Sequence, residues 1–141
     1  MIEPSDETLC AILRETRTIA LVGWSPNPDR PSHEVAAFLK AKGYRVIPVN
    51  PGQAGQQALG ETIAPDLAAL AGEGVDMVDI FRRTDHVPAV VREALAHLPA
   101  LKTIWMQLGI RHAGAADEAG AQGVAVVQDR CPAIEIPRLG L

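Results

Sequence analysis

The stretch from residue 18 to residue 40 constrains the fold more than any other part of this sequence. It opens with the apolar run TIALV, passes through Gly23 and a proline-rich loop, and enters an amphipathic helix for which Ser32 is the predicted N-cap. A strand, a tight turn and a helix N-terminus directed at one point suit the binding of a phosphate group. The loop lacks the G-x-G-x-x-G pattern, which argues against an ordinary dinucleotide-dependent dehydrogenase.

The length and composition of the chain indicate one domain. Its 141 residues are enough to bury a sizeable core, and we expect residues 1–17 to carry an N-terminal helix ahead of a core at residues 18–141. Hydrophobic residues make up 48% of the chain and aromatic residues only 4%, which suits a compact α/β protein. The formal charge of −4 argues against nucleic acid as the main partner.

The sequence carries no recognisable signal for export or membrane insertion. Its first residues include acids and lack the basic region of a signal peptide, and no apolar stretch reaches the roughly 20 residues of a membrane span. Cys10 and Cys131 are far apart without C-x-x-C spacing, so neither a metal site nor a disulfide framework is expected. These features predict a cytoplasmic protein without a membrane partner.

Hydrophobic periodicity and turn signals predict alternating strands and helices. The predicted helices cover residues 7–16, the segment from Ser32 to about Gly43, and residues 66–71, 87–97 and 113–122. The predicted strands cover residues 18–22, 44–49, 62–63, 75–81, 102–107 and 124–127, with a loop at 52–61 and no long element beyond Asp129.

This alternation predicts a Rossmann-like, doubly wound parallel sheet. In the common strand order 3-2-1-4-5-6, the strand at 18–22 lies beside the strand at 75–81. Ligands of such sheets bind outside the carboxyl ends of the strands, at the point where the strand order reverses. The loops at 23–32 and 81–87 are therefore predicted to meet at a binding site.

The first of these loops offers several groups for an anion. Gly23 permits a sharp turn and a close approach of ligand to backbone. The predicted donors are the backbone of Trp24, Ser25 and Asn27, the hydroxyls of Ser25 and Ser32, and Arg30. The alternative is a surface loop followed by an ordinary serine cap.

The second loop contains Arg82 and Arg83, whose guanidinium groups match phosphate oxygens in geometry and charge. In an acidic protein this basic pair suggests an anionic ligand. Alternatively, the arginines pair with Asp79 or Asp85 on the surface. His86 is expected to be an exposed neighbour of the following helix start rather than a base.

Four ordered blocks of this sequence resemble the small bacterial CoA-binding protein family. The blocks are GWSPNPDRPSHEVAAFLKAKGYRVIPVNP, VDMVDIFRRTDHVP, WMQLGI and the late DRC. The family's single domain is similar to the CoA-binding domain of the succinyl-CoA synthetase α subunit. The resemblance covers nearly the whole chain and implies CoA as the ligand.

The resemblance also implies a pose for CoA across the site. The pyrophosphate would lie against the loop from Gly23 to Ser25 and the helix after Ser32. The adenosine end would be flanked by Asn50, Pro51 and the loop formed by Phe81, Arg82, Arg83 and residues up to Val87, and pantetheine would pass Gln107, Leu108 and Gly109. Trp24 replaces the family's usual alanine, so its ring is expected to stack on the ligand or narrow the pocket.

Asn50 helps to separate CoA from NAD. Rossmann proteins that bind NAD typically place Asp or Glu after the second strand to hold the ribose diol. An asparagine there offers no carboxylate, and a carboxylate would repel the 3′-phosphate of CoA. The sequence therefore favours a module that binds CoA or an acyl-CoA without chemistry of its own. The alternative is an NAD(P)-dependent oxidoreductase, or an acyl-CoA-linked enzyme completed by a partner.

The remaining chemical candidates are few. The four histidines are dispersed and show no metal-binding spacing, and His112 is the one weighed for a function, against an ordinary place near a helix start. Cys131 follows the last strand on the ligand edge; it either reaches a ligand thiol, with Arg130 lowering its pKa, or is a buried structural thiol. The apolar tail leaves open whether the chain forms a homodimer.

Overall fold

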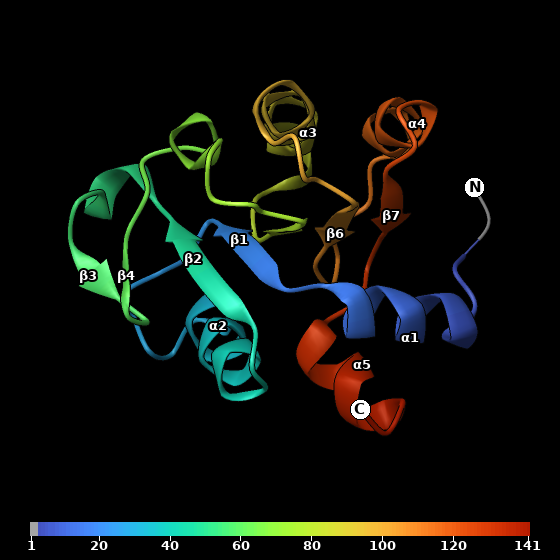
Figure 1. Cartoon of the computed structure of the whole chain (residues 1–141), viewed down its shortest axis with the longest axis horizontal. Coiled ribbons are helices and arrows are strands. Elements are labelled where there is room, and N and C mark those ends of the chain that lie inside the picture. Colours follow the sequence, from blue (N-terminus) through green and yellow to red (C-terminus); the bar gives the residue numbers. More distant parts are fainter. Residues whose placement is uncertain (1–2) are drawn as a thin grey trace.

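Five parallel strands form the central sheet of the computed structural model, which describes residues 3–141 (Figure 1). Their order is β2-β1-β5-β6-β7. The strands are β1 (Thr18–Val22), β2 (Arg45–Val49), β5 (Met77–Ile80), β6 (Thr103–Met106) and β7 (Ala125–Val127). The predicted doubly wound parallel sheet is confirmed.

Helices cover both faces of this sheet (Figure 1). One face carries α1 (Asp6–Glu15), α2 (Pro31–Ala41) and α5 (Pro132–Arg138). The other carries α3 (Val87–His97) and α4 (Ala113–Ala121). Among the residues that the structure describes, no helix is long and apolar enough to cross a membrane.

The core divides into two clusters because neighbouring strand residues point to opposite faces. On β1, Ile19 and Leu21 pack in the cluster beneath α1, α2 and α5. Ala20 and Val22 pack in the cluster beneath α3 and α4. Full burial of one large aliphatic side chain contributes about 1.5–3 kcal/mol to the stability of the fold. Because β1 buries side chains on both faces, it stabilises the packing of both helix layers on the sheet.

The strand order reverses at β1, as predicted. β1 pairs with β2 on one side, where Val22 lies opposite Val49, and with β5 on the other, where Val22 lies opposite Ile80. The chain therefore leaves β1, β2 and β5 at the same edge of the sheet, which positions the candidate site.

Two predictions between β2 and β5 are corrected. The short strand predicted at 62–63 is present as β4 (Glu61–Thr62), but it does not join the main sheet: it forms a separate antiparallel pair with β3 (Gln57–Ala58), and one parallel bridge joins Val49 to Ala64. The predicted helix at 66–71 is reduced to one 3-10 turn, Ala68–Leu70. Because residue 65 is proline and residue 72 is glycine, too few residues remain between them for a stable α-helix.

The start of α2 and the end of the chain also differ from prediction. α2 begins at Pro31, so its N-cap is Arg30 and not Ser32; proline suits the first helical position because its missing N–H has no partner there anyway. After Cys131 the chain forms α5, a short helix that contains Pro137. Its Ile136 is 1% exposed in the core beside α1 and α2, so the tail packs on its own domain.

Candidate functional site

Two adjoining cavities lie at the carboxyl edge of the sheet, with volumes of about 450 Å³ and about 430 Å³. Both are lined by Pro31, Phe81 and Arg82, and we refer to them together as the edge groove. The predicted site residues that line it are Gly23, Trp24, Ser25, Arg30, Ser32, Asn50, Pro51, Phe81, Arg82, Arg83, Gln107, Leu108 and Gly109.

One predicted site residue is not part of the groove. Val87 is fully buried at the start of α3 and lines neither cavity. Its place in the loop predicts a site residue, but the short 3-10 helix Thr84–His86 turns the chain into the core before it. Conversely, Pro31, Thr84 and Ile110 line the groove without having been singled out. The position of Pro31 between the loop after Gly23 and the following helix was the available signal.

Gly23 is required first by the protein's own packing. Its φ is +88°, and a Cβ atom there would lie 2.2 Å from the carbonyl oxygen of Phe81. The ends of β1 and β5 therefore approach each other more closely than any side chain at position 23 would allow. This contact joins the two loops that form the groove.

The loop after Gly23 is held by its own hydrogen bonds. The backbone N–H of Ser25 donates to the Ser32 hydroxyl (3.0 Å), and the N–H of Asn27 donates to the Ser25 hydroxyl (3.1 Å). Two of the predicted ligand donors, the N–H groups of Ser25 and Asn27, are thus used within the protein. Ser32 is 5% exposed and fixes the loop instead of capping the helix.

Two other N–H groups at this place have no such partner. Within residues 3–141, the backbone N–H groups of Trp24 and Ser32 donate to no protein oxygen. Both residues line the first cavity, and Ser32 lies in the first turn of α2. Free N–H groups at a helix N-terminus provide an anion site, and the helix dipole adds about 0.3–1 kcal/mol for a negative charge.

Asn50 joins the ends of β1 and β2. Its Nδ2 donates to the carbonyl oxygen of Trp24 (2.7 Å), while its Oδ1 accepts from the N–H of Gly52 (2.8 Å). Both polar atoms of the side chain are therefore engaged inside the protein. Asn50 shapes the rim of the groove without offering a free carboxylate.

The Trp24 ring is largely buried, although the residue also lines the first cavity. Its side chain is 5% exposed, packs in the cluster beside α2, and stacks on His33 with ring centroids 5.4 Å apart. His33 Nδ1 in turn lies 2.9 Å from the carbonyl oxygen of Ser25. The bulky ring thus packs in the core and, through His33, supports the loop that follows Gly23, while its Nε1 is buried without a partner among the described residues.

The two arginines of the second loop differ in their partners. Arg83 forms a two-pronged ion pair with Asp85, at 3.0 and 3.3 Å, on the exposed surface. The hydrogen bonds from Arg83 hold the pKa of the Asp85 carboxyl below its ordinary value. Arg82 lines both cavities and forms no ion pair with the described residues. The alternative pairing with Asp85 thus holds for Arg83. Asp79 is buried and pairs with neither arginine, and Arg82 has no carboxylate partner among the described residues.

The far end of the groove is formed by the loop after β6. Gln107, Leu108 and Gly109 line the second cavity. The N–H of Gly109 donates to Asp129 Oδ1 at 2.7 Å, so the chain after β7 holds this loop in place. Asp129 is therefore a supporting residue that sequence reasoning missed.

The histidines have ordinary structural positions. His112 is the N-cap of α4, where its Nδ1 accepts from the N–H of Ala115 at 3.0 Å. His86 is an exposed N-cap of α3 without a side-chain cap bond. Within residues 3–141, no group of three or more His, Cys, Asp or Glu side chains is placed to hold a metal ion.

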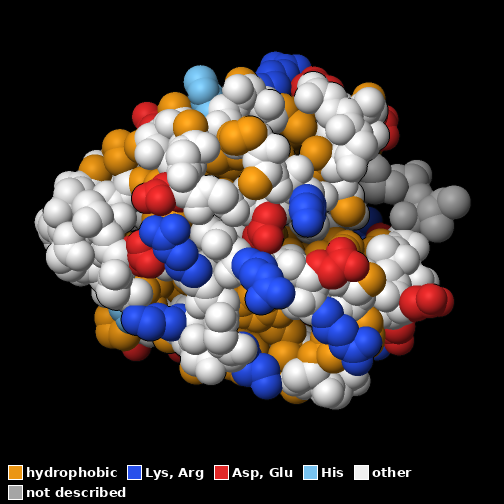
Figure 2. Space-filling view, viewed as in Figure 1, with side chains coloured by type: hydrophobic (Ala, Val, Ile, Leu, Met, Phe, Trp, Pro, Cys, Tyr) orange, Lys and Arg blue, Asp and Glu red, His pale blue; other side chains and the backbone are white. Residues whose placement is uncertain are grey.

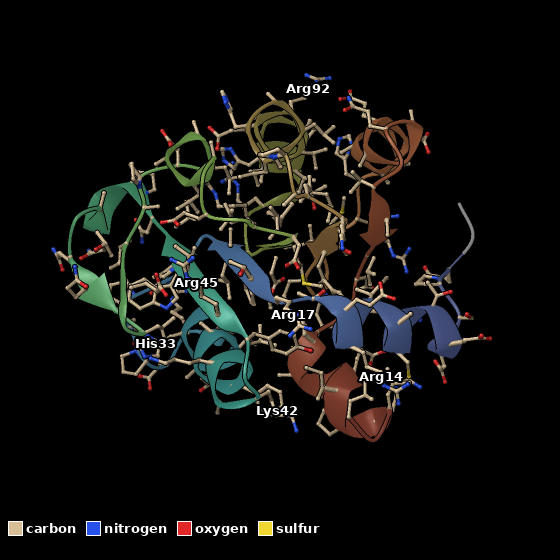
Figure 3. The ribbon with its side chains drawn as sticks, in the orientation of Figure 1. Arg14, Arg17, His33, Lys42, Arg45 and Arg92 are labelled. Atoms are coloured by element: carbon tan, nitrogen blue, oxygen red, sulfur yellow. The ribbon has the colours of Figure 1, made fainter. Side chains whose placement is uncertain are left out.

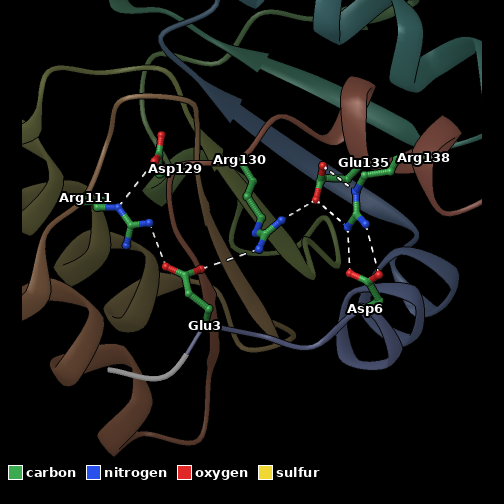
Figure 4. A network of polar contacts seen from close by, with 7 residues as sticks. All are labelled: Glu3, Asp6, Arg111, Asp129, Arg130, Glu135 and Arg138. Atoms are coloured by element: carbon green, nitrogen blue, oxygen red, sulfur yellow. Dashed lines mark hydrogen bonds and ion pairs between the residues drawn. The ribbon is translucent and has the colours of Figure 1, made fainter.

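Cys131 lies in a third cavity of about 370 Å³, whose lining includes Leu108 of the groove. Figure 4 shows the ion pairs around this cavity: Arg130 contacts Glu135 at 2.6 Å and Glu3 at 3.9 Å. Arg138 bridges Glu135 to α1. Cys131 itself is 6% exposed, which fits the buried structural thiol better than a thiol open to ligand.

Basic residues also gather at the opposite, amino edge of the sheet. Figure 3 labels Arg14, Arg17, Lys42 and Arg45 there, around a cavity of about 400 Å³. Arg45 is paired with Glu61 and Glu73, and Lys42 donates to the carbonyl of the last residue. Lys and Arg side chains on this face alternate with acidic ones (Figure 2), so it is a solvated surface of mixed charge.

Solved structures of other proteins share the fold of this chain. The solved structure of cell-free ID.343 from Thermus thermophilus has a TM-score of 0.89 and 38% identity, covering 96% of this chain and 99% of that one. More distantly, the Rex-family repressor RSP in complex with β-NADH has a TM-score of 0.59 at 13% identity, covering 86% of this chain and 57% of that one, and shares the fold alone.

Sequence comparisons agree. YneT of Bacillus subtilis (strain 168) is 34% identical over 131 residues, which are 93% of this chain and 93% of YneT. The model of the CoA binding domain family matches residues 17–137. The chain therefore belongs to the family of CoA binding domain proteins.

Proposed function

We propose that this protein binds CoA or an acyl-CoA in the edge groove. The observation that carries the proposal is the set of unused donors in the first cavity. The N–H groups of Trp24 and Ser32 have no protein acceptor, and Arg30 and Arg82 have no carboxylate partner among the described residues. A pyrophosphate supplies the acceptors and the negative charge that these groups lack.

The second cavity suits the pantetheine arm. Phe81, Leu108 and Ile110 provide apolar surface, and Gln107 provides an amide beside it. Pantetheine has the same alternation, since its aliphatic segments are separated by amide groups. The arm would leave the pyrophosphate near Arg82, which lines both cavities, and continue toward Gly109.

The loop after Gly23 would also suit the pyrophosphate of NAD(P), so the competing function is that of an NAD(P)-dependent oxidoreductase. NAD-binding Rossmann proteins usually hold the ribose diol with a carboxylate after the second strand. Here that place is taken by Asn50, whose two polar atoms are already hydrogen-bonded to Trp24 and Gly52. This arrangement of Asn50 favours CoA over NAD(P). A binding role also fits better than catalysis, because none of the groove residues forms an acid–base or nucleophile pair.

Calorimetric titration with CoA, dephospho-CoA, acetyl-CoA and NAD tests the proposal. We expect CoA to bind, dephospho-CoA to bind more weakly, and NAD to give no heat. Acetyl-CoA separates a site that needs the free thiol from one that accepts an acyl group. Binding of NAD without binding of CoA would overturn the proposal in favour of the oxidoreductase.

A further inference from the structure

Asp79 is a buried carboxyl group in the middle of the sheet. It lies on β5 with Leu21 of β1 on one side and Trp105 of β6 on the other, and its side chain is 0% exposed. Neither of its carboxyl oxygens has a hydrogen-bond partner among the described residues. An ionised carboxylate in such a place costs several kcal/mol, and burial raises the pKa of Asp79 well above its ordinary value.

Other titratable groups do not account for this state. The elements packed on the same face carry Asp6 and Cys10 on α1, His33 and Glu34 on α2, and Cys131 and Glu135 at the start of α5. None of them contributes to the shift of the Asp79 pKa, whose cause is burial. Burial without a hydrogen-bond partner favours the neutral form of the carboxyl, which has an O–H donor.

Gln107 is a second polar side chain with an unsatisfied oxygen. It is 6% exposed and lines the second cavity of the groove, yet its Oε1 is buried without a hydrogen-bond partner among the described residues. A buried amide oxygen without a donor is unfavourable by about 1–3 kcal/mol. The neutral Asp79 carboxyl thus has an O–H without an acceptor, and Gln107 Oε1 is an acceptor without a donor among the described residues.

The sheet register brings these two side chains to the same face. Asp79 lies opposite Trp105, and Gln107 is two residues beyond Trp105, so its side chain points to the side that Asp79 faces. Adjacent strands lie about 4.8 Å apart and rise about 3.3 Å per residue, so the Cα atoms of Asp79 and Gln107 are roughly 8 Å apart, within reach of a long side chain such as glutamine. The buried Asp79 is therefore within reach of Gln107, which lines the second cavity.

We propose that Asp79 is a positioning residue: as a neutral acid it donates a hydrogen bond to Gln107 Oε1 and keeps the Gln107 amide N–H groups directed into the edge groove. There they would donate to an amide carbonyl of the pantetheine arm. This inference rests on the proposed CoA function. An ionised Asp79 would instead repel Oε1 and turn the amide over, which would present an acceptor to the ligand.

Infrared difference spectroscopy tests the hydrogen bond without any ligand. At neutral pH the wild type should show the C=O band of a protonated carboxylic acid that is absent from Asp79→Asn. In Gln107→Leu this band should move to higher frequency, because the acid loses its acceptor. A wild type without the band, or a band that Gln107→Leu leaves in place, would overturn the inference.

Binding measurements test the effect on the groove. Asp79→Asn retains a neutral donor and should bind CoA within about twofold of wild type, whereas Asp79→Leu should bind about 3- to 10-fold more weakly, as expected for one lost hydrogen bond. Adenosine 3′,5′-bisphosphate lacks the pantetheine arm, so both variants and the wild type should bind it equally.

The outcomes separate this inference from the proposed function. If wild type binds neither CoA nor the bisphosphate, the CoA function itself fails. If wild type binds CoA and Asp79→Leu binds it equally well, only the role of Asp79 fails. Should Asp79→Leu not fold, the infrared comparison of wild type, Asp79→Asn and Gln107→Leu still decides the question.

Discussion

The hydroxyl of Ser32 accepts a hydrogen bond from the backbone N–H of Ser25, seven residues earlier in the chain, at 3.0 Å. This bond closes the loop over the N-terminus of α2 and leaves the N–H groups of Trp24 and Ser32 without protein acceptors. In the proposed function, the loop would hold these donors in place before a phosphate binds, which would reduce the entropy lost on binding.

Ser32 and Ser25 should differ in what their replacement affects. Ser32→Ala removes the acceptor of a part-buried N–H and should lower the free energy of unfolding by about 1 kcal/mol, measured by urea denaturation. Ser25→Ala is the matched control: its hydroxyl accepts only from the exposed N–H of Asn27. Its loss should leave stability nearly unchanged and weaken CoA binding by about 1 kcal/mol, if the O–H donates to phosphate. Equal effects of both variants on stability would contradict this division.

Arg82 and Arg83 should differ in affinity although they are adjacent. Arg82→Ala should weaken CoA binding by about 1.5–3 kcal/mol, the contribution of a charge-assisted hydrogen bond, whereas Arg83→Ala should have a smaller effect because Arg83 is already paired with Asp85. Calorimetry measures both, with Arg92→Ala as a control for losing a paired surface arginine far from the groove. An Arg82→Ala variant with wild-type affinity would remove Arg82 from the site.

Asn50→Asp should impair the site in a pH-dependent way. The new carboxylate would still accept from Gly52, but it would face the carbonyl oxygen of Trp24 where Nδ2 now donates at 2.7 Å. Affinity for CoA should therefore fall as the pH rises through the pKa of the introduced carboxyl, and recover in part at acidic pH, where the protonated form can donate. Titrations of variant and wild type over the same pH range show whether this dependence belongs to the substitution.

Glu135 should contribute to stability at neutral pH. Burial acts to raise the pKa of its carboxyl, but hydrogen bonds from Arg138 and Arg130 outweigh burial and hold the pKa below its ordinary value of 4.5. A group with a lowered pKa in the folded state stabilises the fold above its unfolded pKa, and this contribution is lost as the pH falls below that value.

Glu135→Gln should accordingly lower the free energy of unfolding at neutral pH by roughly 1.5–3 kcal/mol and flatten the loss of stability on acidification. Asp85→Asn, which breaks a pair whose side chains are 78% and 65% exposed, should have little effect. Urea denaturation over a range of pH values measures both variants. If Glu135→Gln loses as much unfolding free energy on acidification as the wild type, the role of the network in Figure 4 is contradicted.

Sequence patterns predicted the elements whose signals were strong and local. The strand at Thr18–Val22 and the helix at Val87–His97 were predicted to the residue, the strand from its apolar run and the helix from its amphipathic pattern. The helix α5 was missed because Pro137 lies inside it; only its packing through Ile136 into the core stabilises so short a segment. Tertiary contacts of this kind leave no periodic signal.

The site followed from connectivity, but the partners of its side chains did not. The strand order alone brings the loops after β1 and β5 together, so most groove residues were predicted. Ser32 and Asn50 form hydrogen bonds within the protein only because separate loops are placed relative to one another to within a few tenths of an ångström. The sequence does not give that placement. Asp79 gave no signal as a functional group, because an acid in an apolar strand becomes informative only when its lack of partners is known.

A crystal structure of the protein with CoA tests the central claim most directly. The account predicts that the pyrophosphate oxygens accept hydrogen bonds from the N–H groups of Trp24 and Ser32 beside Arg82, with the pantetheine arm along Gln107 and Leu108. Density for CoA outside the edge groove, either beside Cys131 or at the amino edge near Arg17, would contradict it.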